Sequence, residues 1–520
     1  MSRSFDARQA QTTLFDALVQ ARQTYGAKKL ILEDQERAPL SYTDLIRAAF
    51  ALGRKIAGFT EPGERVGVML PASSASVVTF FALHAFGRTP TMLNFTAGIR
   101  NLKAACELAG VKRLLTSHRF VEQGKLHDLV DALETLTTVT YLEDVRRTIG
   151  LPDKLFAAAA GAFPKRFRTP SKPGDPGVIL FTSGSFGAPR GVVLSQANLI
   201  ANVRQVDQHI PLDRGWVMFN PLPTFHCFGL TGGVLLPILC GLRTFQYPSP
   251  LHIKQIPPLI KDTGASVLFA TDTFLNQYAR SAESDELSGL VFIVCGAEKV
   301  REETHNLIAE RFGDVPVLEG YGATEAAPVI AVNKPGDNRR GTVGGLLPGM
   351  EARLEPVEGI PGGGKLHVRG PNVMVGYLKP GGGIEPPDDG WHDTGDVVSI
   401  DPDGDWVKIK GRVKRFAKVG GEMVSLTAAE DLASHVWPES RHAVVAMPDP
   451  KKGERLILVT DRRDADSAAL IAHAKTIGAP EIAVPRKIIK TSEIPVLGTG
   501  KTDYVAIQRM VDTELQERAA

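Results

Sequence analysis

The stretch Ile179-Leu-Phe-Thr-Ser-Gly-Ser-Phe-Gly-Ala-Pro-Arg-Gly-Val-Val-Leu194 places two apolar segments on either side of a loop rich in glycine and hydroxyl groups. This pattern predicts a strand, a phosphate-binding loop and a second strand. Glycine reaches backbone conformations closed to other residues, so consecutive amides can point at one anion while hydroxyls add further donors. The residues that would do so are Gly184, Gly187, Gly191, Thr182, Ser183 and Ser185. Taken alone, the stretch could also be a Gly/Ser hairpin between buried strands.

The spacing within this loop excludes two common phosphate motifs. A P-loop requires Lys-Ser or Lys-Thr directly after its last glycine, and a dinucleotide fingerprint requires Gly-x-Gly-x-x-Gly opening a helix. The loop instead resembles the Thr-Ser-Gly-Thr-Thr-Gly-x-Pro-Lys-Gly signature of the adenylate-forming superfamily. Arg190 stands at the usual lysine and keeps a cation there, whereas Phe186 replaces a smaller or polar residue.

Length and composition indicate an ordinary globular protein with more than one domain, because the 520 residues are 43% hydrophobic and 23% charged. The formal net charge is +2 and no Lys/Arg tract is long enough for a binding arm, so we expect no nucleic-acid partner. The four cysteines are scattered without a Cys-x-x-Cys pair, which disfavours a zinc site or a disulfide framework and favours a cytoplasmic location.

The hydropathy pattern predicts neither a signal peptide nor a membrane span. The N-terminus lacks an apolar core, and no apolar run approaches the roughly 20 residues of a transmembrane helix. Peripheral contact with the inner membrane stays open.

Strand and helix signals alternate along the first part of the chain, which predicts an α/β fold with parallel sheets. Strands are predicted near residues 65–70, 90–93, 113–116 and 139–142, with helices at 12–25, 42–49 and 76–85. Residues 151–175 lose this periodicity and are predicted to be a connector that crosses the surface. After the loop, strands near 217–220, 267–270 and 290–295, with a helix rich in small residues at 229–239, predict a second sheet.

Beyond Gly341 the sequence pattern changes to short β segments between Gly and Pro clusters, which predicts a small antiparallel β unit. The tail from about Gly411 is long enough for a compact small domain. We therefore predict a large domain over residues 1–410, comprising two α/β sheets (about 1–175 and 176–340) and a β unit (341–410). A mobile α+β domain over residues 411–520 would follow it.

A second polar run, Glu319-Gly-Tyr-Gly-Ala-Thr-Glu325, follows the apolar residues 315–318. Its polar side chains should therefore emerge at the end of a strand, where open α/β sheets bind ligands. Glu325 is a hard oxygen ligand suited to Mg²⁺, Thr324 can donate to a phosphate, and Tyr321 offers a ring face for adenine. The alternative is a Gly-rich turn with a solvated glutamate. The run, with Gly322, also matches the Tyr-Gly-x-Thr-Glu motif of the same superfamily.

Further stretches resemble the superfamily's remaining motifs, in order. By this resemblance Asp396, at the end of Gly390-Trp-His-Asp-Thr-Gly-Asp396, holds the ribose hydroxyls, and Arg412 contacts the ribose or a phosphate. Lys414 would be the hinge residue. Lys501, on a Gly-flanked loop, would reach both the substrate carboxylate and the α-phosphate. The alternatives are a basic surface strand around residue 412 and a solvated lysine at 501.

Smaller features agree with the same resemblance. It implies that His226 gates the acyl pocket, and it counts His226 and Thr182 with Lys501 and Glu325 as catalytic residues. The adenine turn would be Gly296, Ala297 and Glu298, and the thiol channel would pass Gly420 and Gly421. Three helix glycines could leave room for an acyl chain, although tight helix packing explains them as well: Gly229, Gly232 and Gly233.

The runs 92–98, 412–425 and 497–503 resemble more closely the acyl-ACP synthetase half of the bacterial bifunctional 2-acylglycerophosphoethanolamine acyltransferase/acyl-ACP synthetases. The resemblance implies an acyl-CoA synthetase-like fold and a ligase that uses ATP and Mg²⁺. Such an enzyme joins a long-chain fatty acid to AMP and then transfers the acyl group to the thiol of holo-ACP. One site would serve both steps by rotation at Lys414.

Three alternatives share these motifs: a long-chain fatty acyl-CoA synthetase, an acyl-AMP ligase that does not use CoA, and an inactive adenylate-binding regulator. If the carrier is ACP, an acidic protein, basic residues of the small domain should receive it. The candidates are Arg415, Lys418, Lys451 and Lys452, for which a solvated surface is the plain alternative.

Overall fold

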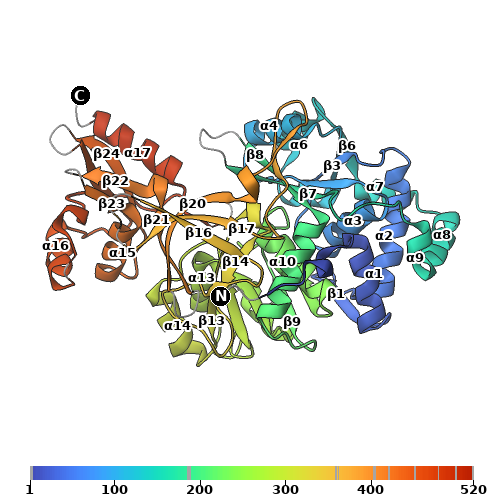
Figure 1. Cartoon of the computed structure of the whole chain (residues 1–520), viewed down its shortest axis with the longest axis horizontal. Coiled ribbons are helices and arrows are strands. Elements are labelled where there is room, and N and C mark those ends of the chain that lie inside the picture. Colours follow the sequence, from blue (N-terminus) through green and yellow to red (C-terminus); the bar gives the residue numbers. More distant parts are fainter. Residues whose placement is uncertain are drawn as a thin grey trace.

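The computed structural model of the chain describes residues 4–183, 189–357, 360, 362–401, 406–419, 422–449, 453–477, 479–497 and 500–517. Within these residues, strands form three sheets of thirteen, eight and five strands. The two larger sheets and their helices make up most of the molecule, and the five-stranded sheet lies at the end that holds the C-terminus (Figure 1).

The eight-stranded sheet carries the hairpin on either side of the predicted phosphate loop. Its order is β19-β18-β8-β7-β4-β3-β5-β6. Pairing is parallel from β7 to β6, as the alternation of elements predicts, and antiparallel from β7 to β19. The strands are β3 (Arg65–Val68), β4 (Thr89–Met92), β5 (Arg113–Thr116), β6 (Thr138–Tyr141), β7 (Pro176–Ser183), β8 (Pro189–Ser195), β18 (Gly376–Leu378) and β19 (Ile384–Glu385).

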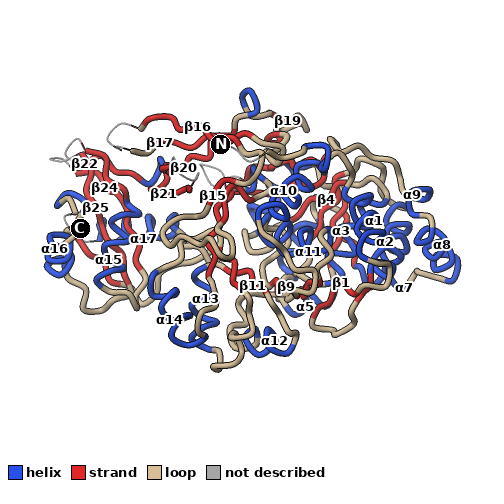
Figure 2. The backbone as a smooth tube through the Cα atoms, turned by 60° about the horizontal axis from the view of Figure 1, so that its bottom comes forward, coloured by secondary structure: helices blue, strands red, loops and turns tan. Residues whose placement is uncertain are grey.

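Helices from the first third of the chain gather beside this sheet (Figure 2). Three begin at serines, Ser41, Ser73 and Ser117, whose hydroxyls accept the backbone N–H three residues on. The helices are α1 (Leu14–Tyr25), α2 (Tyr42–Ala57), α3 (Ser74–Ala85), α4 (Ile99–Ala109), α5 (His118–Gln123), α6 (His127–Glu134), α7 (Leu142–Arg147), α8 (Leu151–Ala162) and α9 (Pro164–Phe167).

The predicted connector at residues 151–175 is wrong in its first half, because α8 and α9 are helices. Alanine is a strong helix former, which favours a helix in this run. Asp153 accepts the backbone N–H of Gly150 and so caps the first turn of α8. The helical period is weak in the sequence because α8 has apolar residues on both faces.

The thirteen-stranded sheet has the order β16-β17-β20-β21-β15-β14-β13-β12-β11-β9-β10-β1-β2. Pairing is parallel from β1 to β13 and antiparallel from β13 to β16. Its strands are β1 (Leu30–Asp34), β2 (Leu40–Ser41), β9 (Val217–Asn220), β10 (Arg243–Gln246), β11 (Val267–Ala270), β12 (Phe292–Cys295), β13 (Val317–Gly322), β14 (Val329–Val332), β15 (Gly345–Leu346), β16 (Glu351–Pro356), β17 (Gly364–Arg369), β20 (His392–Asp401) and β21 (Trp406–Arg412).

One apolar core joins the two large sheets through α10, which contributes Leu199, Ile200 and Val203 to it. The predicted helix at 229–239 is present as a π-helical segment followed by α11. The helices of this region are α10 (Gln196–His209), the π-helix η2 (Phe228–Leu235), α11 (Leu236–Leu239), α12 (Ile256–Asp262), α13 (Asp272–Ser281) and α14 (Glu302–Phe312).

The chain passes from the thirteen-stranded sheet to the five-stranded sheet through the short helix η5 (Val413–Arg415). The strands of the smaller sheet have their own apolar cores with the C-terminal helices. These elements are β22 (Phe416–Val419), β23 (Glu422–Ser425), β24 (His442–Asp449), β25 (Gly453–Thr460), β26 (Lys487–Lys490), α15 (Leu426–Val436), α16 (Ser467–Thr476) and α17 (Tyr504–Glu517).

The sheets do not divide where the sequence pattern places the boundaries inside residues 1–410. β7 and β8 lie after residue 175 but belong to the sheet of β3 to β6, whereas β1 and β2 join the other sheet. The strands of residues 341–410 form no sheet of their own within the described residues, because they extend the two large sheets. The boundary near residue 410 stays a prediction, and the change of sheet at η5 agrees with it.

No helix in the described part of the chain has the length and apolar character needed to cross a lipid bilayer.

Candidate active site

The hairpin of β7 and β8 brings Thr182 directly opposite Arg190. The guanidinium carbon of Arg190 lies 4.2 Å from the centre of the Tyr377 ring, a cation–π contact that fixes the cation beside the loop. Three residues predicted to contact phosphate lie outside the described residues, namely Gly184, Ser185 and Gly187, as do the neighbouring Phe186 and the side chain of Ser183. Phosphate contact by this loop stays a prediction.

Glu325 lies in the short helix η3 (Thr324–Ala326) that follows β13. Its Oε1 accepts a hydrogen bond of 2.7 Å from the hydroxyl of Tyr377. Burial and the charge of Glu325 raise the pKa of Tyr377, so this hydroxyl stays protonated and remains a donor. Tyr377 was missed by the sequence analysis, because contacts between distant segments, such as the hydrogen bond from Met374 N to the Glu325 carbonyl, bring residue 377 to residue 325.

Asp396 is a buried carboxylate held from two sides. Its Oδ2 accepts a hydrogen bond of 2.6 Å from the Tyr321 hydroxyl, and its Oδ1 accepts one of 2.7 Å from Nε of Arg412. Asp396 and Arg412 are direct partners across β20 and β21. Each oxygen keeps a second lone pair, so a ribose hydroxyl can still be bound. The structure thus brings together three residues predicted to contact the nucleotide.

Lys501 extends from the small domain to these groups. Burial and the nearby Arg412 cation lower its pKa, while the charges of Glu298 and Asp396 act in the opposite direction. The preceding Gly500 has a φ of +85°, and a side chain there would lie 3.1 Å from the Phe274 ring and 3.3 Å from Oγ1 of Thr271. The loop is therefore seated against the first turn of α13.

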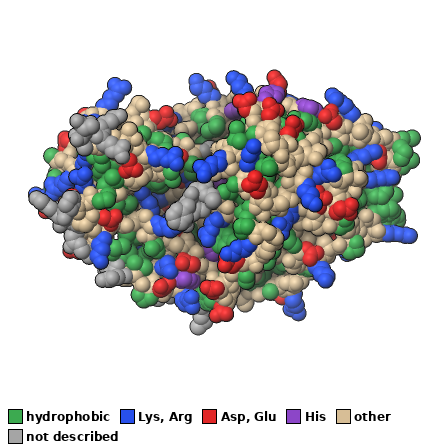
Figure 3. All heavy atoms as spheres, turned by 90° about the horizontal axis from the view of Figure 1, so that it is seen from above, with side chains coloured by type: hydrophobic (Ala, Val, Ile, Leu, Met, Phe, Trp, Pro, Cys, Tyr) green, Lys and Arg blue, Asp and Glu red, His purple; other side chains and the backbone are tan. Residues whose placement is uncertain are grey.

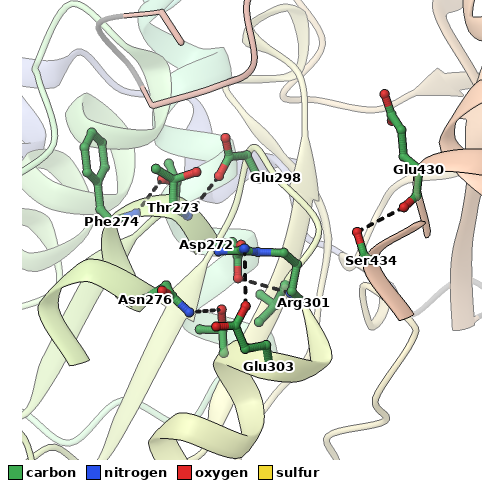
Figure 4. A network of polar contacts seen from close by, with 12 residues as sticks. Asp272, Thr273, Phe274, Asn276, Glu298, Arg301, Glu303, Glu430 and Ser434 are labelled. Atoms are coloured by element: carbon green, nitrogen blue, oxygen red, sulfur yellow. Dashed lines mark hydrogen bonds and ion pairs between the residues drawn. The ribbon is translucent and has the colours of Figure 1, made fainter. Parts of the chain in front are cut away.

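The first turn of α13 is itself built from polar contacts. The carboxylate of Glu298 accepts the backbone N–H of Thr273 at 3.0 Å, and Asp272 pairs with Arg301 at 2.5 Å. Figure 4 shows Glu298 pointing at this turn from the segment that follows β12. Burial raises the pKa of Glu298. Its predicted place along the adenine, with Gly296 and Ala297, stays a prediction.

His226 is a half-buried, neutral imidazole close to Lys501. Burial, with a smaller contribution from the Lys501 charge, lowers its pKa to about 3. Its Nε2 has no hydrogen-bond partner among the described residues, although the atom is buried. Such an orphaned polar atom is rare in proteins and suits a contact with a substrate.

An apolar cavity of about 50 Å³ is lined by residues of α10, of η2 and of neighbouring strands. Phe228, which separates the cavity from the turn at Gly296, lies 3.2 Å from the position of a Cβ at that glycine. Thr231 is the one polar side chain among the described residues that line the cavity. The walls include Val203, Met218, Phe228, Gly232, Phe269 and Val294.

The three helix glycines differ in their surroundings. A Cβ at Gly229 would lie 2.3 Å from the carbonyl oxygen of Pro223, and one at Gly233 would lie 2.1 Å from Cγ of Asn220. These two glycines allow tight packing. Gly232 instead borders the cavity, where a Cβ would lie at an ordinary 3.4 Å from Phe228.

The remaining predicted residues have mixed outcomes. Gly322 has a packing reason, because a Cβ there would lie 2.0 Å from the carbonyl oxygen of Pro328. Lys414 lies in η5, between the two sheets. Gly420 and Gly421 lie outside the described residues, so the thiol channel stays a prediction.

Comparison with known proteins identifies the family. Residues 18–378 match the sequence profile of the family described as AMP-binding enzyme. The chain belongs to this family. It is 29% identical to feruloyl-CoA synthase of Amycolatopsis sp over 478 residues, which cover 89% of the chain and 92% of the relative. It is 27% identical to long-chain-fatty-acid–CoA ligase of Salmonella typhimurium LT2 over 480 residues, 84% of each chain.

Solved structures share the fold. ATP-bound MatB from Rhodopseudomonas palustris has a TM-score of 0.80 at 24% identity, with 96% of this chain and 99% of that chain covered. The o-succinylbenzoate CoA synthetase of Bacillus subtilis, in complex with ATP and magnesium ion, has a TM-score of 0.79 at 18% identity, with 95% and 98% covered. The fold is therefore that of the adenylate-forming acyl-CoA synthetases, as the motifs predict.

Membership in the family makes the chain an AMP-forming acid–thiol ligase, and enzymes of this family use ATP with Mg²⁺. The described residues fit both. Mg²⁺ is commonly held by one or two carboxylates together with substrate phosphates and water. Glu325 offers one carboxylate, and no group of three or more His, Cys, Asp or Glu able to hold a metal occurs in the described part of the chain.

Proposed function

We propose that the enzyme activates a long-chain fatty acid and transfers the acyl group to a phosphopantetheine thiol. In the first step a carboxylate oxygen bonds to the α-phosphorus of ATP, the bond to the bridging oxygen breaks, and pyrophosphate leaves. In the second step the thiol sulfur bonds to the acyl carbon, AMP leaves, and the thiol proton passes to solvent. The observation that carries the substrate class is the apolar cavity behind Phe228.

An aliphatic chain suits this cavity better than a hydroxylated aromatic ring. A buried phenol or methoxyphenol hydroxyl requires a hydrogen-bond partner, and the described lining offers only Thr231. The cavity is far smaller than the roughly 300–1,000 Å³ typical of sites for drug-sized ligands. A long chain would therefore enter only as Phe228 and its neighbours move apart.

Four side chains are assigned roles in adenylation on their positions. Asp396 and Arg412 would hold the ribose, and Lys501 would neutralise charge between the carboxylate and the α-phosphate. Glu325 would hold Mg²⁺, which when bound neutralises the departing pyrophosphate. The half-buried, neutral His226 would contact the acyl carboxylate end without adding a charge beside Lys501.

The second step would require Lys501 to leave. Gly500 packs its loop against α13, and an exposed ion pair between Lys299 and Asp431 of α15, 2.8 Å apart, joins the small domain to the larger body. Pairs this exposed contribute about 0–1 kcal/mol, so this ion pair would offer little resistance to a rotation of the small domain at η5. Rotation at Lys414 is thus part of the proposal.

Two carriers are candidates for the thiol. The relatives named CoA ligases support CoA. The three sequence runs that resemble acyl-ACP synthetases support holo-ACP. The prediction that Arg415 receives ACP is wrong, because this side chain is only 15% exposed and is bound to Glu430. Lys418 is exposed, whereas Lys451 and Lys452 lie outside the described residues.

Pyrophosphate release measured with saturated fatty acids of increasing length, and with coumarate and ferulate, tests the substrate class. We expect activity with long fatty acids and little with the phenolic acids; the reverse order would refute the fatty-acid proposal.

Thioester formation with CoA and holo-ACP in parallel then identifies the carrier. Lys418→Glu should raise the KM for holo-ACP more at low salt than at high, and Lys379→Glu, an exposed lysine before β19, is the control. No pyrophosphate from any acid would favour the inactive regulator, and pyrophosphate without any thioester would favour the acyl-AMP ligase.

A further inference from the structure

Helix α8 presents apolar residues to both the protein and the solvent. On its inner face Phe156 meets the ring of Phe50 of α2 edge-on, with centroids 6.2 Å apart. Gly161 allows α2 to approach closely, because a Cβ there would lie 2.8 Å from Cγ of Arg47. The inner face therefore packs α8 against α2, and this packing does not involve the outer face.

The outer face of α8 and the residue after it form an exposed apolar surface, here named the α8 patch. Leu151, Leu155 and Phe163 are 69%, 63% and 67% exposed. Three alanines at helical spacing complete the patch: Ala158, Ala159 and Ala162. Apolar side chains scattered singly on a surface are ordinary, but a contiguous group on one helix face indicates an interaction site. Hydrophobic side chains appear at this end of the molecule beside Lys and Arg in Figure 3.

The charged side chains of the segment that carries the α8 patch are of one sign. Residues 154–174 include five Lys or Arg and no Asp or Glu. Arg168 pairs with Asp16, and the other four are exposed: Lys154, Lys165, Arg166 and Lys172. The preceding Asp153 is buried and neutralised by Lys55 at 2.7 Å. The patch is therefore an apolar stripe bordered by cations.

We propose that the α8 patch docks on the surface of an anionic phospholipid bilayer. Its leucines and phenylalanine would enter the boundary between headgroups and acyl chains, while the cations would meet lipid phosphates. A second copy of the chain is a poorer occupant, because a twofold-symmetric contact through this patch would place lysines and arginines opposite one another. The charge thus favours an anionic lipid surface.

The position of the patch suits such docking. Helices α8 and α9 lie at the end of the molecule opposite the five-stranded sheet (Figure 1). A bilayer bound there leaves the small domain and the Lys501 loop unobstructed. This proposal does not depend on the fatty-acid proposal, since it concerns only where the protein sits.

Flotation with lipid vesicles tests the proposal on the full-length protein. We expect co-flotation with vesicles of equal parts phosphatidylglycerol and phosphatidylcholine, and little with phosphatidylcholine alone. The double variant Leu155→Ser/Phe163→Ser should lose at least about tenfold in vesicle affinity. Lys165→Ala/Arg166→Ala should lose about fivefold for each cation removed, and high salt should reduce binding by the native protein. Leu251→Ser, at a position 63% exposed and outside the patch, should bind like the native protein.

Unchanged thermal unfolding would show that these surface variants fold. Three results would overturn the proposal: native protein that does not float with anionic vesicles, patch variants that float as well as native protein, or equal binding to neutral vesicles. Self-association that the Leu155→Ser/Phe163→Ser variant abolishes, with no vesicle binding, would also overturn it and assign the patch to a second copy.

Discussion

The hydroxyl of Tyr377 donates a 2.7 Å hydrogen bond to Oε1 of Glu325, 52 residues away in the chain, while Arg190 lies against the ring of the same tyrosine. One side chain thus positions both the proposed Mg²⁺ ligand and the cation of the phosphate loop. Groups that orient a metal ligand typically contribute 10–100-fold to metal affinity or activity.

Tyr377→Phe should therefore weaken adenylation through Mg²⁺. The phenylalanine ring keeps the contact with Arg190 but removes the hydrogen bond to Glu325. We expect about a tenfold higher Mg²⁺ requirement in pyrophosphate release, with little change in thermal stability. Tyr377→Leu, which also removes the ring, should be worse. An unchanged Mg²⁺ titration for Tyr377→Phe would show that the hydrogen bond does not support the metal site.

Lys501→Ala should abolish acyl-adenylate formation and largely spare thioester formation from supplied acyl adenylate. The native adenylation rate should fall on the alkaline side at a pH below 10.5, because the lowered pKa of Lys501 means that its charge is lost sooner than in free lysine. Lys501→Arg should move this decline to higher pH. Equal loss of both half-reactions in Lys501→Ala would contradict the proposed role.

Gly232→Val should shorten the acyl chains that the enzyme accepts. The new side chain would occupy the cavity next to Phe228, where a Cβ fits at 3.4 Å. We expect KM to rise by about tenfold for long chains and to change little for short ones, since one methylene group in an apolar pocket changes binding by about 1–3 kcal/mol. A uniform change across the chain-length series would place the acyl chain elsewhere.

Arg415→Ala should destabilise the small domain. Its guanidinium binds Glu430 at 2.5 Å, donates to the Val444 carbonyl at 2.8 Å and lies 3.8 Å from the Tyr504 ring centre. Removing one partner of a buried pair costs about 3–5 kcal/mol, because the other charge is left buried. Thermal unfolding should show the loss, whereas Lys418→Ala on the exposed face should change stability by less than about 0.5 kcal/mol. Equal Tm values for the two variants would rule out a structural role for the pair.

Stability should fall with acid because two histidines are held in neutral form. Burial lowers the pKa of both His84 and His226 to about 3, against 6.5 in the unfolded chain. Between these values the unfolded state binds more protons, so the free energy of unfolding falls as pH decreases from 6.5 toward 3. Each histidine contributes up to about 1.4 kcal/mol per pH unit. Urea unfolding of His84→Leu should show a shallower pH dependence, and the same slope as in native protein would contradict this assignment.

The strands of the first sheet were predictable from the sequence, because they depend on local patterns. Asp396, Arg412 and Tyr321 lie together in the structure, and their roles toward the nucleotide stay predictions. Sheet membership was less predictable, since β1 pairs with β10, more than two hundred residues away, and nothing local specifies that partner.

The features that the sequence did not predict also have physical explanations. Helix α8 is apolar on both faces, which removes the periodicity that identifies a helix in sequence. Tyr377 follows a stretch rich in Gly and Pro, and its place in the site depends on strand pairing between distant segments. Arg415 lies in a basic run that looks like surface, and only the burial of Glu430 from α15 explains it.

Asp396 and Arg412 form an ion pair, and Arg412 is the residue directly before η5. If the small domain swings at η5, everything that grips the nucleoside stays with the larger body, and only the lysine is carried away. The acyl adenylate would then stay bound to the larger body while the small-domain residues beside it are exchanged. A mixed anhydride that would otherwise hydrolyse in water need never be released between the two reactions.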